Sequence, residues 1–301
     1  MEAELRPIQG DRFQPTGFPN LGHARYESPN GQGQMVLVES AQSMANRLEA
    51  VCWDEVADDW VQPLKGLPYI RVVKRDKGET EIVTNSVLEA HRINSEYIAR
   101  SAEFKTEVVD EVMRFQKGQP FDIRRQLVPA LLRFDINSLI HGVFLEEIAG
   151  VIRLPRTLSA FIEASDARIA ESGGVKFNRV DPSLREGEGN VPYPRTEWVS
   201  ARLTVYFNLD LRQIRAFGLG SNVEKLLIAL ALFKVRKFLA VGLRLRTACD
   251  LDLDSLAVTR PENFVLPKLA DLEEELPDLI EAVGAGGHFG DDPVLTVTSP
   301  K

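Results

Sequence analysis

The stretch 201–249 constrains the fold more than any other part of the chain, because it predicts a strand, a helix and another strand in succession. Residues 201–211, "ARLTVYFNLDL", alternate between apolar and polar side chains, which is the period of a half-buried strand. A serine followed three residues later by a glutamate forms a capping box that predicts a helix over 222–239. Residues 242–249 alternate again, which predicts the second strand.

Similar signals earlier in the chain supply the remaining elements of one domain. Strands are predicted near 4–12 and 157–164, and a helix near 38–53. The order strand, helix, strand, strand, helix, strand is that of a ferredoxin-like domain of the α+β class. Residues 60–150 are then an insertion, in which "YIRVVKRDKGETEIVTNSV" predicts a β-hairpin around a Lys-Gly turn.

The two central strands are joined by a long segment rich in glycine and proline, "SGGVKFNRVDPSLREGEGNVPYPRTEW" at 172–198. A connection of this length is uncommon in a compact domain unless it carries function or is disordered. Both interpretations stay open at this point, a disordered segment or a functional loop that projects from the domain.

The helix predicted at 38–53 has an unusual polar side. A period of 3.6 residues gathers the apolar residues Ala41, Met44, Ala45, Leu48 and Cys52 on one arc. The opposite arc carries Glu39, Ser40, Gln42, Ser43, Asn46, Arg47 and Glu49. Serine and asparagine are weak helix formers, so helix stability does not explain why they line the open face. Short hydrogen-bonding groups suit close contacts to phosphates and sugars, which position a polynucleotide without reading its sequence.

Charge is unevenly distributed along the chain. The formal net charge is −8, but between Asp250 and Asp292 twelve acidic residues accompany two basic ones, so this segment carries −10 and the remainder +2. Residues 234–246 contain five lysines and arginines and no acid. Such segregation permits a specific nucleic-acid groove, although an acidic segment can also serve only to keep a protein soluble.

Catalytic and metal-binding motifs are sparse. The sequence has no phosphate-binding loop, nucleophile elbow or His-Glu-x-x-His pair, and its two cysteines are too few for a disulfide framework or a zinc site. Gly218 and Gly220 precede a helix but lack the third glycine of a dinucleotide fingerprint, which favours a structural turn. His91 and His141 are candidates for acid–base chemistry, although a structural or RNA-contacting role is favoured for each. We expect no cofactor and no metal.

No segment predicts a secretion signal or a membrane span. The first residues carry charges throughout, and the longest apolar run, "LLIALALF", is far shorter than the roughly 20 residues that a spanning helix needs. We therefore expect a cytoplasmic protein with no membrane partner.

Five motifs together point to one family: "RFQPTGFPNLG", "LVESAQSMANRLEAVCWD", "LEAHRINS", "YFNLDLRQIR" and "LRLRTACDL". They resemble the backbone subunit of the type I-U (renamed I-G) CRISPR effector, the Csb-one branch of the Cas-seven family, over roughly residues 4–270. The resemblance implies an RRM-like palm over 1–270, with inserted finger elements at about 60–150 and a thumb at about 172–198. An acidic segment at 271–301 follows.

The resemblance further implies a non-catalytic scaffold. Copies of the chain are expected to stack along a CRISPR guide RNA, each thumb interrupting the duplex that the guide forms with the target DNA strand. The other expected partners are the large subunit, the RNA-processing or capping subunit and a recruited helicase-nuclease, which cuts the DNA in type I systems. Related type III backbone subunits cleave target RNA with a loop aspartate, so Asp54, Asp58 and Asp59 stay open as candidates for that role.

The matching motifs and the polarity of their residues define an expected RNA interface. Ten residues are placed there: Arg12, Gln14, Ser43, Asn46, Arg47, His91, Arg92, Asn94, Arg244 and Arg246. The rival hypothesis is an enzyme, a metal-independent endoribonuclease that processes CRISPR RNA with His91 or His141. A third alternative is a small-ligand-binding domain that uses the turn at 218–222.

Overall fold

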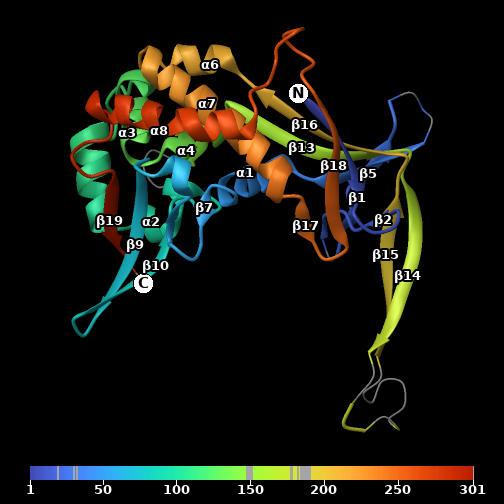
Figure 1. The fold of residues 1–301 in the computed structure, drawn as a ribbon. Coiled ribbons are helices and arrows are strands. Elements are labelled where there is room, and N and C mark those ends of the chain that lie inside the picture. Colours follow the sequence, from blue (N-terminus) through green and yellow to red (C-terminus); the bar gives the residue numbers. More distant parts are fainter. Residues whose placement is uncertain are drawn as a thin grey trace. The chain divides into compact units, whose positions relative to one another are not determined.

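The structure is a computed structural model and describes residues 1–18, 20–29, 31, 33–146, 152–176, 179–181, 183 and 191–300 (Figure 1). The chain divides into two compact units, each assembled from three segments. Unit 1 comprises Met1–Ser43, Ala160–Tyr206 and Leu239–Phe264. Unit 2 comprises Met44–Ser159, Phe207–Phe238 and Val265–Lys301.

A seven-stranded sheet organises unit 1, with the strand order β17-β18-β1-β16-β13-β6-β5. Its strands are β1 (Glu2–Pro7), β5 (Arg25–Glu27), β6 (Gln34–Glu39), β13 (Leu158–Ser165), β16 (Arg202–Leu209), β17 (Arg244–Arg246) and β18 (Cys249–Ala257). β1 runs antiparallel to both of its neighbours, β16 and β18. The mixture of helices and strands agrees with the predicted α+β class.

Alternation predicted two of the central strands correctly. β13 buries every second residue, Leu158, Ala160, Ile162 and Ala164, as the pattern of 157–164 indicates. β16 buries Leu203, Val205 and Phe207 on the predicted apolar face. Sequence alternation was reliable here because one face of each strand enters the core.

The strands predicted at 4–12 and 242–249 were wrong in extent. β1 ends at Pro7, and Gly10 with φ of +62° lies in the bend that follows. β17 has three residues, and the longer strand next to β1 is β18, which begins after Ala248 at φ +58°. A turn built on a non-glycine residue at positive φ gives no strong sequence signal, which explains the second error.

Both ends of the segment 172–198 lie in paired strands and not in a loop. β14 (Arg168–Lys176) and β15 (Val191–Val199) pair antiparallel from Arg168 opposite Val199 to Lys176 opposite Val191. β15 also pairs with β2 (Arg12–Phe13), which completes a three-stranded sheet within unit 1 (Figure 1). Residues 177–178, 182 and 184–190, in the middle of the predicted thumb, lie outside the described part of the chain.

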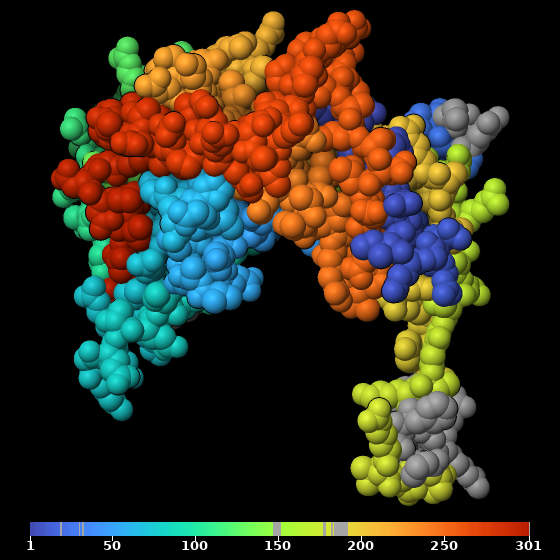
Figure 2. Space-filling model, in the orientation of Figure 1, coloured from blue at the N-terminus to red at the C-terminus, as the bar shows by residue number. Residues whose placement is uncertain are grey.

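In unit 2 the predicted hairpin is confirmed. β9 (Tyr69–Asp76) pairs antiparallel with β10 (Glu79–Asn85), and Lys77 and Gly78 form the turn with positive φ. Figure 2 shows the end of this hairpin (cyan) protruding from unit 2. β19 (Val294–Thr298) pairs parallel to β9.

Short strand pairs and helices complete the fold. The short strands are β3 (Gly17–Phe18), β4 (Gly22–His23), β7 (Trp53–Asp54), β8 (Asp59–Trp60), β11 (Val143–Leu145) and β12 (Ile152–Leu154). The α-helices are α1 (Ala41–Ala50), α2 (Glu96–Ala99), α3 (Val128–Phe134), α4 (Ile136–His141), α6 (Leu211–Ala216), α7 (Ser221–Val241) and α8 (Leu269–Ala285). The 3-10 helices η1 (Gln62–Leu64) and η2 (Arg92–Asn94) and the π-helical η3 (Phe104–Met113) and η4 (Ile123–Leu127) lie in unit 2.

The acidic C-terminal segment is folded into unit 2. α8 buries Leu272, Leu276, Ile280 and Val283 at helical spacing and keeps its acidic residues on the outer face. The boundary predicted at 270 therefore falls inside α8, and 271–301 belongs to the same compact unit as 44–159. None of the helices in the described residues is long and apolar enough to cross a membrane.

Candidate nucleic-acid interface

The helix α1 and the turn after it bury the predicted apolar arc except for Ala41, but the polar side of the helix is less open than expected. Met44, Ala45, Leu48 and Cys52 are buried as predicted. Glu39 and Glu49, both assigned to the open arc, are buried as well, each 1% exposed. Because a buried carboxylate needs a charged or hydrogen-bonding partner, these two positions serve the fold instead of a solvated face.

The exposure of three residues predicted to contact RNA, Ser43, Asn46 and Arg47, is intermediate between buried and open. All three are half-buried, and the Ser43 amide donates a hydrogen bond to Ser40 Oγ at 3.3 Å. Within the described chain, Asn46 Oδ1 is buried and has no hydrogen-bond partner. The expectation of a fully exposed polar face on α1 was therefore wrong, because the surrounding structure covers part of it.

Arg92 lies in the interior of unit 2 and is bound by Glu49. Its Nε and Nη2 donate to the two carboxylate oxygens of Glu49 at 2.6 and 2.7 Å, and its Nη1 donates to Gly142 O at 3.4 Å. With 4% exposure and a bidentate partner, this guanidinium is not available at the surface for RNA, contrary to its sequence assignment. Its neighbour His91 is exposed, and Asn94 Oδ1 accepts a hydrogen bond from the Glu146 amide at 3.1 Å.

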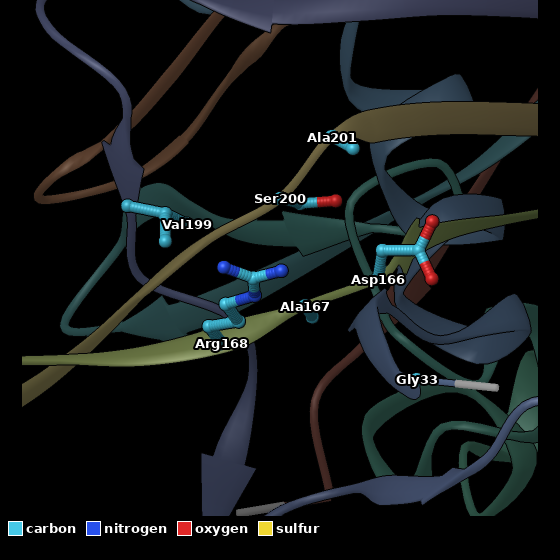
Figure 3. A pocket seen from close by; sticks show the side chains of 7 residues that line it. All are labelled: Gly33, Asp166, Ala167, Arg168, Val199, Ser200 and Ala201. Atoms are coloured by element: carbon cyan, nitrogen blue, oxygen red, sulfur yellow. The ribbon is translucent and has the colours of Figure 1, made fainter.

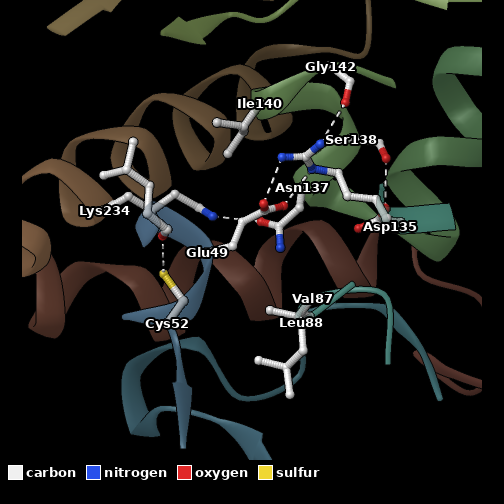
Figure 4. Close-up of polar contacts among 12 residues, drawn as sticks. Glu49, Cys52, Val87, Leu88, Asp135, Asn137, Ser138, Ile140, Gly142 and Lys234 are labelled. Atoms are coloured by element: carbon white, nitrogen blue, oxygen red, sulfur yellow. Dashed lines mark hydrogen bonds and ion pairs between the residues drawn. The ribbon is translucent and has the colours of Figure 1, made fainter. Parts of the chain in front are cut away.

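Other charged groups surround this pair inside unit 2 (Figure 4). Lys234, fully buried on α7, donates from Nζ to Asn137 Oδ1 at 2.7 Å, and burial lowers the pKa of Lys234. Burial also raises the pKa of Asp135 to about 7, although Ser138 Oγ donates to its carboxylate at 2.7 Å and opposes the shift. The cluster is closed to solvent, so its role is to organise the core of unit 2.

Unit 1 brings three of the predicted residues, Gln14, Arg244 and Arg246, into one neighbourhood. Arg246 Nη1 donates to Gln14 O at 3.0 Å and to Val38 O at 3.2 Å, while its Nη2 pairs with the buried carboxylate of Glu39. Arg244, two residues earlier on β17, is exposed and lies 3.5 Å from Asp250 Oδ1. Arg246 therefore anchors the segment and Arg244 faces solvent.

Arg195, a residue that sequence reasoning missed, connects Arg246 to Arg12. Arg195 Nε donates to Gln14 Oε1 at 3.3 Å, and its Nη2 donates to Thr247 O at 3.2 Å. Glu197 lies 3.5 Å from Arg195 Nε and 3.7 Å from Arg12 Nη1. Arg195 lies in the segment interpreted as a long connection, so no periodic pattern singled it out.

We call Arg12, Arg195, Arg244 and Arg246 the arginine cluster. Three carboxylates, Glu39, Glu197 and Asp250, accompany these four guanidinium groups, which leaves a local excess of positive charge. The side chains of Arg12 and Arg244 are more than half exposed. Guanidinium groups bind phosphates through paired hydrogen bonds, so an exposed cluster of this kind suits a chain of phosphates.

An open pocket of about 550 Å³ also lies in unit 1 (Figure 3). Its lining consists of Gly33, Asp166, Ala167, Arg168, Val199, Ser200 and Ala201, at the base of the β14–β15 hairpin. Ser200 Oγ is engaged with Ser165 O at 2.5 Å and Arg202 O at 2.8 Å. The one hydroxyl proton of Ser200 is therefore directed at backbone carbonyl groups and not at a side-chain base.

The residues considered for catalysis have structural surroundings. His141 is buried, its ring nitrogens have no hydrogen-bond partner among the described residues, and burial next to Lys234 holds its pKa well below the usual value. Asp54 Oδ1 accepts the amides of Val56 and Ala57 at 3.0 and 3.1 Å, which fixes the turn between β7 and β8.

The remaining candidates lie in turns or directly beside one. Asp58 adopts φ of +46° in the turn between β7 and β8, and Asp59, the first residue of β8, accepts the Trp60 amide at its Oδ1 at 2.8 Å. Gly218 and Gly220 both have positive φ in the turn before α7. In the part of the chain that the structure describes, no three His, Cys, Asp or Glu side chains gather as metal ligands do.

Fold and site together define an α+β protein with an antiparallel sheet and a solvent-facing arginine cluster. The chain belongs to the family described as CRISPR-associated protein GSU0053, which matches residues 1–169, more than half of its length. A solved structure titled "CRISPR RNA-guided surveillance complex, pre-nicking" is similar at a TM-score of 0.44 and 11% identity, over 94% of this chain and 89% of that chain. This likeness is too distant to carry an argument about function. No curated protein matches the chain.

Proposed function

We propose that this chain is a non-catalytic, guide-RNA-binding backbone subunit of a type I-G CRISPR interference complex. The observation that carries the proposal is the arginine cluster of unit 1, in which Arg12 and Arg244 expose guanidinium groups while Arg246 is anchored to the backbone of Gln14 and Val38. Membership of a CRISPR-associated family supports it. Such contacts hold the sugar–phosphate backbone and leave the bases free to pair with a target.

The strand order of unit 1 favours an RRM-like palm as the platform for this RNA. Four neighbouring strands, β18-β1-β16-β13, follow the 4-1-3-2 order of a ferredoxin-like sheet, with α1 and α7 in the two helical connections. β6 and β5 extend the sheet beyond β13. Under this proposal the β14–β15 hairpin acts as the thumb. Under this proposal the other partners are further copies of the chain, the target DNA strand, the large subunit, the RNA-processing or capping subunit and a recruited helicase-nuclease.

The test measures how RNA affinity depends on salt. The double variant Arg12→Ala/Arg244→Ala removes two exposed cations, so the slope of log affinity against log salt should fall by about 0.7 for each phosphate of a single strand that is no longer neutralised. Fluorescence anisotropy with a labelled repeat–spacer RNA over a salt series gives this slope. The matched control is Arg215→Ala in unit 2, which removes an exposed arginine paired with Glu224 at 3.0 Å and should leave the slope unchanged. An equal fall of the slope in the two variants would contradict the proposed interface.

The second candidate function is a metal-independent endoribonuclease. Of its two candidate catalytic residues, His91 is favoured over His141, because His91 is exposed and His141 is buried. The same binding reactions, incubated with a chelator and separated on a gel, distinguish the two. Intact RNA supports the scaffold, whereas discrete fragments that disappear with His91→Ala support the nuclease.

A further inference from the structure

The side chain of His23, at the end of β4, is held from two sides in unit 1. On one side Trp198 Nε1 donates to His23 Nδ1 at 2.7 Å, and the two rings meet edge to face with centroids 6.0 Å apart. Trp198 is 1% exposed, so this contact lies at the buried root of β15. An indole N–H is a donor only, and therefore His23 Nδ1 must be unprotonated for the contact to exist.

On the other side His23 Nε2 lies 2.8 Å from the side-chain amide of Gln14. With Nδ1 accepting from Trp198, the neutral ring carries its proton on Nε2. The Gln14 atom assigned nearest to it is the amide nitrogen, so the amide must be turned to present its oxygen to that proton. In that orientation the amide nitrogen of Gln14 faces Arg195, so the Gln14 oxygen serves either His23 or Arg195 and not both. Gln14 thus joins His23 to the arginine cluster through its backbone carbonyl oxygen, which accepts a hydrogen bond from Arg246 Nη1 at 3.0 Å.

Protonation would break this arrangement. An imidazolium carries a proton on both ring nitrogens, so Nδ1–H would face the indole N–H of Trp198 across 2.7 Å. The charged group that acts on the ring is Arg246 on β17, which is paired with Glu39 on β6. The other cations of the arginine cluster, Arg195 on β15 and Arg12 on β2, are paired with Glu197 on β15. Burial and the charge of Arg246 lower the pKa of His23, which keeps the ring neutral at neutral pH.

We propose that His23 is a positioning residue for the arginine cluster: as a neutral imidazole it holds Trp198, three residues from Arg195 on β15, and it releases Trp198 when it is protonated. The inference rests on the proposed RNA-binding function and predicts that RNA binding weakens as the pH falls. A histidine that only added positive charge near the RNA would have the opposite effect, because it would strengthen binding at low pH. The sign of the pH dependence therefore separates the two roles.

The experiment compares three proteins at pH 7.5 and pH 5.5 by anisotropy with the labelled RNA. The wild type should bind about two- to tenfold more weakly at the lower pH, the value of one net hydrogen bond. His23→Asn places an amide oxygen near the position of Nδ1 and does not titrate, so it should bind like the wild type at pH 7.5 and show no weakening at pH 5.5. His23→Leu should bind weakly at both pH values. A weakening that persists in His23→Asn would overturn the proposal.

A second readout needs no RNA. The indole ¹⁵N–¹H resonance of Trp198, identified by its absence in Trp198→Phe, should move between the two pH values in the wild type and stay fixed in His23→Asn. If it moves while no RNA binds at any pH, the proposed function fails and the role of His23 in holding Trp198 stands. An unchanged resonance in the wild type would overturn the His23 inference, whatever the RNA affinity.

Discussion

The pair Arg92–Glu49 in unit 2 and the pair Arg244–Asp250 in unit 1 join the same kinds of groups in opposite surroundings. Arg92 has 5% of its side chain exposed and reaches Glu49 at 2.6 Å, whereas Arg244 has 82% exposed and lies 3.5 Å from Asp250. Water and salt screen the second pair and leave the first almost unscreened. Polarity and motif alone place both arginines at the RNA.

The difference between these pairs shows that burial decides whether an arginine stabilises the fold or is available to bind a phosphate. A guanidinium enclosed with its carboxylate contributes to the fold, because neither group has water to replace its partner. An exposed guanidinium can exchange a weak carboxylate contact for a phosphate at little cost. Arg246 is intermediate, since it is about one-quarter exposed while its partner Glu39 is buried. Removing each arginine in turn tests this interpretation.

Arg92→Met should have the largest effect on stability. The substitution leaves Glu49 buried without its charge partner, and the free energy of unfolding should fall by about 3–5 kcal/mol. Urea unfolding followed by circular dichroism measures the change. The control is Glu49→Met/Arg92→Met, because replacing a whole buried pair by apolar side chains is often nearly neutral. A double variant as unstable as the single one would show that the altered packing around Arg92, and not the stranded charge, causes the effect.

Removing Arg246 should have an intermediate effect. Arg246→Ala takes away the donor that this guanidinium supplies to the Glu39 carboxylate and to two backbone carbonyls, which should cost about 1–3 kcal/mol of unfolding free energy. Introducing Glu39→Gln into this variant removes the buried charge and should restore part of the stability in the same urea experiment. If the added substitution destabilises the protein further, Glu39 has another charge partner that supports it.

Sequence patterns predicted the elements that have one apolar face. The strands β13 and β16, the β9–β10 hairpin and the start of α7 at Ser221 all follow from local periodicity or capping, which needs only neighbouring residues. The β14–β15 hairpin was missed, because its glycines and prolines are typical of loops. In the structure those residues lie in strands paired along their whole length.

The candidate site was less predictable, since its pairs join residues far apart in the chain. Glu49 and Arg92 are 43 positions apart, and Glu39 and Arg246 are 207 apart, so no spacing rule marks them as partners. A helical period places Glu49 on the polar side of α1 but cannot show that another segment covers that side. For the same reason the sequence singled out Arg12, Gln14 and Arg246 but not Arg195, which lies between them.

The smallest effect on stability is expected at Arg244, and it completes the comparison. Arg244→Ala removes an exposed partner of Asp250, and exposed ion pairs are worth about 0–1 kcal/mol, so the urea midpoint should barely move. The salt slope of RNA binding should nevertheless fall by about 0.7, the value of one neutralised phosphate on a single strand. Burial would not be the deciding variable if Arg244→Ala destabilised the protein as much as Arg92→Met. A normal midpoint with an unchanged slope would instead place Arg244 outside the RNA path and leave Arg12 and Arg195 as the cations that the cluster presents.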